Sequence, residues 1–245
     1  MTVDLNCDLG EGAGHDAGLM PLITSANIAC GAHAGDRRTM RETVSLARQN
    51  GVGIGAHPGF ADRNNFGRRE IALPAHELRN LVMGQIARLQ EIGPVRHVKP
   101  HGALYNLAAG DRVVADAVAE AVQTIDPSLI LFGLAGSELV RAGRARELKV
   151  AEEVFADRTY QKDGSLTPRS EPDALIHDEE TAVAQILRMV REGVVRAVDG
   201  TDVAITADTI CLHGDGPHAV DFAWRLRREL ALAGVEVRAF GSATT

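Results

Sequence analysis

Short β-prone runs alternate with helical patterns from one end of the chain to the other, and this alternation constrains the fold more than any other feature. The predicted strands cover residues 3–7, 25–29, 53–56, 97–99, 129–133, 150–155, 209–212 and 235–239. Parallel strands need crossover connections, which are usually helices. The pattern therefore predicts an α/β protein with a parallel sheet, either a closed β/α barrel or an open doubly wound sheet.

The helices between these strands have recognisable ends and apolar faces. Asp36 and Asp111 are placed as N-caps of two helices, and Gly93 and Gly193 follow the last apolar residues of two others. The expected apolar stripes are formed by Met40, Val44 and Ala47; by Leu78, Leu81, Val82, Ile86 and Leu89; by residues 114–122; and by Val183, Ile186, Leu187 and Val190. A last helix is expected from Pro217 to Gly234.

The choice between barrel and open sheet depends on phosphate-binding motifs. An open sheet of the dinucleotide-binding kind needs GxGxxG after its first strand, but residues 10–15 read GEGAGH. No GxxxxGK[ST] motif occurs either. The length of 245 residues suits one barrel, and no linker or repeat divides the chain. We therefore predict a single-domain β/α barrel over residues 1–245.

Composition narrows the classes of partner. Lys and Arg (26) against Asp and Glu (33) give a net charge of −7 with no basic run, which argues against nucleic acid and anionic membranes. The three cysteines lack CxxC spacing, the first residues carry acidic groups instead of a signal peptide, and no apolar run is long enough to span a membrane. A cytoplasmic protein with a small-molecule substrate is expected.

Polar and ionisable residues recur where the predicted strands end. In a β/α barrel the carboxyl ends of the strands form the active-site face. Four of the nine histidines stand there, each within two residues of a glycine. The candidates are Asn6, Asp8, Glu11, Asn27, His33, His57, Lys99, His101, Glu153, Asp157, Arg158, His213 and Asp215. The other histidines (His15, His76, His97, His177 and His218) lack this context and are interpreted as structural or solvent-facing.

Lys99 lies within a predicted strand, where an ammonium group needs an anionic partner. It either forms a structural salt bridge to Glu153 or Asp8, or it faces the substrate and stabilises a developing oxyanion. Cys30 and Cys211 are interpreted as small buried hydrophobes, and no GxSxG nucleophile elbow is present.

Two polar loops follow predicted strands. The segment 159–178 is punctuated by Gly164, Pro168 and Pro172, and loops this long are either lids or disordered segments. Arg169 would supply it with a group suited to a carboxylate. The segment 62–69 adds Arg68 and its neighbours near the same face.

Long stretches of the sequence resemble the LamB/YcsF family. They are DLNCDLGEG (4–12), SANIACGAHAGD (25–36), GIGAHPG (53–59), FGRR (66–69), HVKPHGALYN (97–106), FADRTYQKDGSL (155–166) and TICLHGD (209–215). Ala32, Arg37 and Ala61 depart from residues that the family often has, and none of them belongs to the ionisable set.

The resemblance implies an ATP-dependent hydrolase that opens the lactam of 5-oxoproline to L-glutamate together with two further subunits, B and C. It also implies a seven-stranded β/α barrel similar to those of polysaccharide deacetylases and certain glycoside hydrolases. ATP is the expected co-substrate, because phosphorylating the amide oxygen makes an unstrained lactam a better electrophile.

For this reaction we expect acid–base and electrostatic roles for Asp8, Glu11, His33, His57, Lys99, His101, Glu153, Asp157 and His213. We expect substrate contacts from Asn6, Asn27, Arg68, Arg158, Arg169 and Asp215. A carboxylate and two imidazoles of this set could hold a divalent ion, although the spacing does not require one. Two alternatives remain open: a metal-dependent deacetylase of N-acetyl sugars, and a non-catalytic subunit that presents substrate to its partners.

Overall fold

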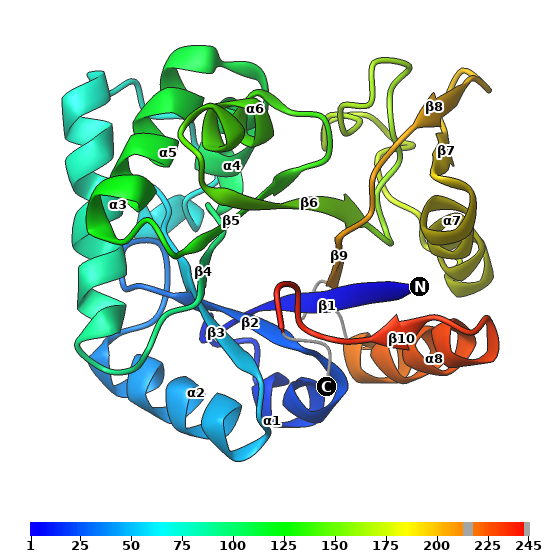
Figure 1. Cartoon of the computed structure of the whole chain (residues 1–245), viewed down its shortest axis with the longest axis horizontal. Helices are drawn as coiled ribbons and strands as arrows, with labels where there is room; N and C mark the ends of the chain where they lie inside the picture. Colours follow the sequence, from blue (N-terminus) through cyan, green and yellow to red (C-terminus); the bar gives the residue numbers. More distant parts are fainter. Residues whose placement is uncertain (213–217, 243–245) are drawn as a thin grey trace.

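The chain forms a closed barrel of parallel strands in a computed structural model that describes residues 1–212 and 218–242. Seven strands make up the barrel: β1 (Thr2–Leu9), β2 (Ser25–Ala29), β3 (Gly53–His57), β4 (His97–Val98), β5 (Ile130–Leu134), β6 (Lys149–Phe155) and β9 (Thr209–Leu212). The barrel closes because β9 pairs with β6 on one side and with β1 on the other. The predicted seven-stranded β/α barrel is thus confirmed (Figure 1).

Helices surround the barrel strands, as Figure 1 shows. The α-helices are α1 (Asp16–Leu19), α2 (Arg37–Gln49), α3 (Ala75–Gln90), α4 (Gly102–Gly110), α5 (Arg112–Ile125), α6 (Glu138–Ala145), α7 (Glu179–Glu192) and α8 (Ala219–Leu232). Two short 3-10 helices, η1 (Met20–Leu22) and η2 (Arg63–Asn65), lie in loops. None of the helices in the described part of the chain has the length and apolar character needed to cross a membrane.

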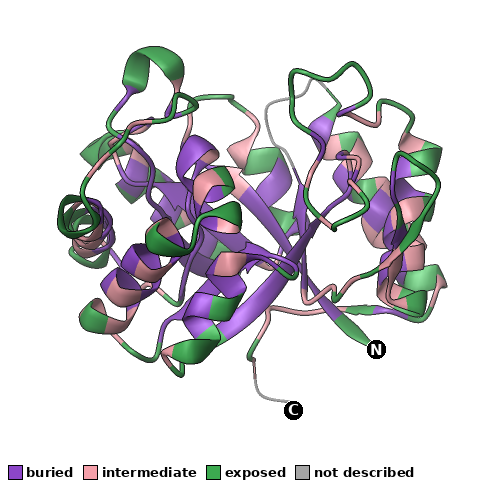
Figure 2. Ribbon diagram, turned by 90° about the horizontal axis from the view of Figure 1, so that it is seen from above, coloured by how far each residue is buried: buried purple, intermediate pink, exposed green. Residues whose placement is uncertain are grey.

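The sequence pattern matches this arrangement because the barrel strands are buried on both faces. Every residue of β2, β3, β5 and β9 is buried, as a sheet enclosed by helices requires. Figure 2 shows the buried ribbon concentrated inside the molecule and the exposed ribbon around it. Asp36 accepts a hydrogen bond from the Thr39 amide and Asp111 accepts one from the Val113 amide, so both predicted N-caps are confirmed.

Several short elements differ from the prediction. Helices α4 and α6 were not expected, nor was the antiparallel hairpin of β7 (Val194–Arg196) and β8 (Asp202–Ala204), which stands beside α7 in Figure 1. The last predicted strand is reduced to β10 (Glu236–Val237), which pairs with the first residues of β1 outside the closed ring. These unexpected or shortened elements are two to nine residues long and carry few periods of hydrophobicity.

Candidate active site

The carboxyl ends of the barrel strands surround a cavity of about 550 Å³. Its wall is contributed by the ends of β1, β3, β4, β5 and β6, by the first turns of α4, and by residues 165–169 of the long loop after β6. The predicted site residues that line it are Asp8, Glu11, His57, Lys99, His101, Arg68, Arg158 and Arg169. The active-site face that the strand ends predict therefore contains a real cavity.

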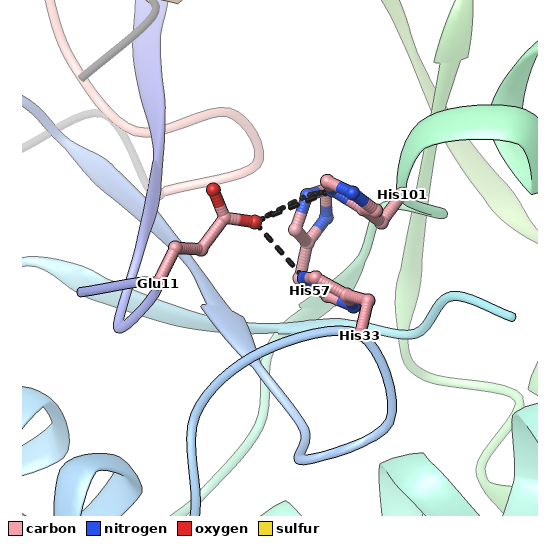
Figure 3. Close-up of side chains that lie close together, drawn as sticks. All are labelled: Glu11, His33, His57 and His101. Atoms are coloured by element: carbon pink, nitrogen blue, oxygen red, sulfur yellow. Dashed lines mark hydrogen bonds and ion pairs between the residues drawn. The ribbon is translucent and has the colours of Figure 1, made fainter. Parts of the chain in front are cut away.

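Three histidines and one glutamate form a cluster (Figure 3), of which Glu11, His57 and His101 line the cavity. Glu11 Oε1 lies 2.9 Å from His33 Nε2, 3.3 Å from His101 Nδ1 and 3.8 Å from His57 Nε2. The His33 and His101 rings are stacked with centroids 3.7 Å apart, and His57 stands edge-on to both. Residues at or just after the ends of four successive strands are thereby brought to one point.

Backbone carbonyls determine which nitrogens of His57 and His101 carry protons. His57 Nδ1 lies 2.7 Å from the Lys99 carbonyl oxygen, and His101 Nε2 lies 2.8 Å from that of Phe66. A carbonyl oxygen only accepts, so both of these ring nitrogens must donate. Phe66 has a left-handed backbone (φ 54°), a costly conformation for a residue with a side chain, which places its carbonyl at His101.

Burial and charge set the protonation of the cluster. Burial, followed by the charge of His57, lowers the pKa of His33 and of His101 from 6.5 to about 3. Burial alone would also lower the pKa of His57, but Asp8, 3.3 Å from its Nε2, and Glu11 raise it instead. Burial raises the pKa of Glu11. The cluster thus contains two neutral imidazoles beside one that favours its charged form.

Lys99 is buried at the centre of a second polar group. Its Nζ lies 3.0 Å from Asp8 Oδ1 and 2.8 Å from Glu153 Oε1, and it also contacts Asn6 Oδ1 and Cys211 Sγ. Burial opposes the charge, but Asp8, Cys211 and Glu153 raise the pKa of Lys99 well above its ordinary value. Lys99 therefore stays charged, and the expected salt bridge is formed to both carboxylates while the side chain also lines the cavity.

Asn6 and Asn27, expected to contact substrate, lie in the barrel interior instead. Both are fully buried, and Asn27 Nδ2 donates to Asn6 Oδ1 and Asp8 Oδ1. Neither is among the described residues that line the cavity. Because their amides bond to the side chains of the site, they hold Asp8 and Glu153 in place from below.

The long loop after β6 is an ordered wall of the cavity. Tyr160 and Thr167 are fully buried, and the Tyr160 hydroxyl accepts a hydrogen bond from the Phe155 amide. Arg158, nearly buried, donates to the carbonyls of Ala174 and Thr167 and so anchors the loop from inside. These bonds hold the loop at Thr167 and Ala174, and Arg169 and the exposed Arg68 line the cavity.

The remaining candidates are not brought to the cavity wall. His33 lies behind His101, and Glu153 lies beneath Lys99. Asp157 is partly buried and is not among the described lining residues. His213 and Asp215 lie outside the described residues. His76, His177 and His218 are exposed, as expected, and His97 is buried within the barrel.

Sequence reasoning missed Tyr105, which lies in α4 and lines the cavity. Burial and then the charge of Glu153 raise its pKa well above the ordinary value, so its hydroxyl keeps its proton. A usable signal was present in the sequence, because Tyr105 follows His101 by four residues and a helix starting there turns both toward the same side.

A β/α barrel with buried imidazoles, carboxylates and a lysine around one cavity at its strand ends has the architecture of a barrel enzyme. The chain belongs to the LamB/YcsF family, whose family model matches residues 3–245. It is 56% identical over 250 residues to the 5-oxoprolinase A subunit of Bacillus licheniformis, covering 98% of this chain and 99% of the relative. The 5-oxoprolinase A subunit of Bacillus subtilis is 54% identical, and the match covers 97% of this chain and 96% of that protein.

Solved structures agree with the barrel. A lactam utilization protein from Thermus thermophilus has a TM-score of 0.92 and 48% identity, covering 98% of this chain and all of that one. A deacetylase named T48 matches with a TM-score of 0.51 and 14% identity, over 96% of this chain and 86% of that one. The second likeness concerns the fold alone.

Proposed function

We propose that this chain is the component of an ATP-dependent 5-oxoprolinase that binds 5-oxoproline and takes part in opening its lactam ring to L-glutamate. The observation that carries the proposal is the cavity at the strand ends, where Asp8, Glu11 and Lys99 lie beside two histidines. The names of its relatives, 5-oxoprolinase A subunit and lactam utilization protein, support the same reaction.

The chemistry of the cavity suits a small anion with an amide group. Arg68 and Arg169 line the cavity wall with guanidinium groups, the side chains best suited to a carboxylate. Leu134 and Phe155 add apolar surface for the methylene carbons of the ring. Only 4% of residues are aromatic, so stacking platforms for a sugar are scarce, which favours the lactam over an N-acetyl sugar.

Ring opening requires a water nucleophile, a proton for the ring nitrogen and stabilisation of negative charge on the carbonyl oxygen. In this proposal Asp8, Glu11, His57 and His101, which all line the cavity, activate water and deliver the proton. Lys99, which lines the cavity and stays charged, stabilises the negative charge in this proposal. Because opening an unstrained lactam is difficult, we propose that ATP activates the amide oxygen in an assembly with subunits B and C.

The proposal is tested with the purified full chain and isotopically labelled 5-oxoproline, with and without subunits B and C and with and without ATP. Labelled glutamate should appear only when all three subunits and ATP are present. Glutamate release by the chain alone without ATP would contradict the proposed coupling. Release of acetate from N-acetyl sugars instead would support the deacetylase alternative.

A non-catalytic role is distinguished in the same assay. If the chain only presents substrate, changing Asp8 to Asn should weaken substrate binding, seen as a higher KM, with kcat unchanged. The proposed catalytic role predicts a loss in kcat for the Asp8→Asn variant, with Glu77→Gln on an exposed helix face as the matched carboxylate control.

A further inference from the structure

When the imidazoles are neutral, the atoms that converge at the cavity floor all carry lone pairs. His57 Nδ1 and His101 Nε2 donate to backbone carbonyls, so His57 Nε2 and His101 Nδ1 carry lone pairs in the neutral rings. These two atoms nevertheless face each other at 2.9 Å, and Glu11 Oε1 lies beside both. Such a convergence of lone pairs requires a positive charge between them, either a proton or a metal cation.

The spacing of the three acceptors matches a metal coordination sphere. Their separations are 2.9 Å between the two nitrogens, 3.3 Å from Glu11 Oε1 to His101 Nδ1 and 3.8 Å from Glu11 Oε1 to His57 Nε2. Ligands at about 2.1 Å around a tetrahedral zinc ion lie roughly 3.4 Å apart. The measured separations scatter around that value.

The surroundings of the three atoms resemble the outer shell of a metal site. The other ring nitrogen of each histidine is bonded to a carbonyl, which fixes its orientation and leaves the facing nitrogen as ligand. His33 Nε2 lies 2.9 Å from Glu11 Oε1 and orients that carboxylate. The neutral His33 ring donates from Nε2 to Glu11, and its buried Nδ1, an acceptor, has no hydrogen-bond partner within the described residues.

We propose that Glu11, His57 and His101 bind one divalent transition-metal cation, zinc being the ion that this nitrogen and oxygen donor set fits best. His33 positions Glu11. All three ligand residues line the cavity, so the remaining coordination position faces the space where a small molecule binds. Its ligand class is a water molecule or a carbonyl or carboxylate oxygen.

The metal site does not depend on the proposed lactam reaction, but its use in that reaction does. With the imidazoles engaged as ligands, Asp8, 3.3 Å from His57 Nε2 and 3.0 Å from Lys99 Nζ, is the group left for proton transfer. The binding test therefore uses neither 5-oxoproline nor ATP, so that its failure is distinct from failure of the reaction.

The experiment treats the purified full chain with a chelator, removes the chelator and adds Zn²⁺ or Co²⁺. Mass spectrometry of bound metal, calorimetric titration and the visible absorption of bound Co²⁺ report stoichiometry, affinity and ligand type. We expect one ion per chain. Losing a partner of a ligand costs about 10- to 100-fold in affinity, so Glu11→Gln and His101→Asn, which alter ligands, should each lose at least about 100-fold.

The matched control is His76→Gln, because His76 is an exposed histidine beside a carboxylate, Glu77, 4.0 Å away. It should bind the ion as the wild type does. Zn²⁺ should raise the melting temperature of the wild type and leave that of folded Glu11→Gln unchanged. If His101→Asn does not fold, Glu11→Gln carries the comparison alone.

Three results would overturn the proposal. They are a wild type that binds no Zn²⁺ or Co²⁺, ligand variants that bind with wild-type affinity, and binding that is lost in His76→Gln. In the first case a shared proton between His57 and His101 would remain as the positive charge at this point.

Discussion

Lys99 connects the stability of the barrel to the chemistry of the cavity. Its ammonium group is nearly inaccessible, with a side-chain exposure of 3%, and Glu153 beside it has none. Charges removed from water to this extent are stable only when each has its partner. Lys99 therefore neutralises buried carboxylates, as its structural interpretation expected, and its side chain also lines the cavity, where the catalytic interpretation requires it to lie.

Replacing Lys99 with methionine should destabilise the protein by about 3–5 kcal/mol, because Glu153 would be left buried without its counter-ion. Urea unfolding of Lys99→Met measures this loss. The double variant Lys99→Met with Glu153→Gln removes both charges and should regain most of the stability, yet remain without 5-oxoprolinase turnover. Full stability of the single variant would show that Glu153 does not depend on Lys99.

At the scale of elements, β3 and β4 approach closely around one glycine. A Cβ added to Gly55 would overlap the ring of His97, which is stacked on Phe132 with centroids 4.4 Å apart. His97 Nε2 also bonds to Asn27 Oδ1 at 2.8 Å, so the ring cannot move without breaking that contact. Because Gly55 has no side chain, the His97 ring fits beside it and can bond to Asn27.

Gly55→Ala is therefore expected to destabilise the barrel by about 3 kcal/mol, the upper range for overpacking a core. The matched control is Gly84→Ala in helix α3, where an added Cβ meets no atom within 4 Å. There alanine should stabilise by about 0.5–1 kcal/mol, because glycine is a poor helix former. Chemical denaturation measures whether each substitution lowers or raises the free energy of unfolding. Equal effects of the two substitutions would show that the contact with His97 does not restrict residue 55.

The sequence predicts long elements and strand ends well and tertiary neighbours poorly. The alternation of strands and helices predicts a parallel sheet, and the missing phosphate-binding motifs together with the chain length select the barrel. The strand ends are enough to predict Asp8, Glu11, His57, Lys99 and His101 at the cavity. Asn6 and Asn27 were misplaced because a barrel strand points alternate side chains inward, and inward residues near the strand end can lie beneath the cavity instead of in it. The ordered wall formed by the long loop depends on buried contacts of Tyr160 and Arg158, which no local pattern reveals.

At the scale of the whole molecule, buried histidines make stability depend on pH. Burial, followed by the charge of Lys99, lowers the pKa of His97 from 6.5 to about 3. The unfolded chain takes up a proton on this residue as the pH falls below about 6.5, whereas the folded protein does not. The free energy of unfolding therefore decreases as the pH falls from 6.5 toward 3, because only the unfolded chain binds this proton.

This contribution is measured by comparing the wild type with His97→Gln, which keeps a donor for Asn27 and removes the titrating ring. Between pH 6 and pH 4 the wild type should lose about 1.4 kcal/mol per pH unit more than the variant. Urea unfolding across this range gives both slopes. Parallel slopes would mean that His97 is protonated in the folded state.

The central claim is that the cavity at the strand ends carries the opening of the lactam ring. The most direct measurement is ATP-dependent glutamate release from 5-oxoproline, in the presence of subunits B and C, by the wild type, His57→Ala, His101→Ala and His76→Ala. We expect losses of roughly a hundredfold or more for His57→Ala and His101→Ala, because both line the cavity, and little change for the exposed His76→Ala. Equal activities of the three variants, with folding verified by thermal unfolding, would contradict the claim.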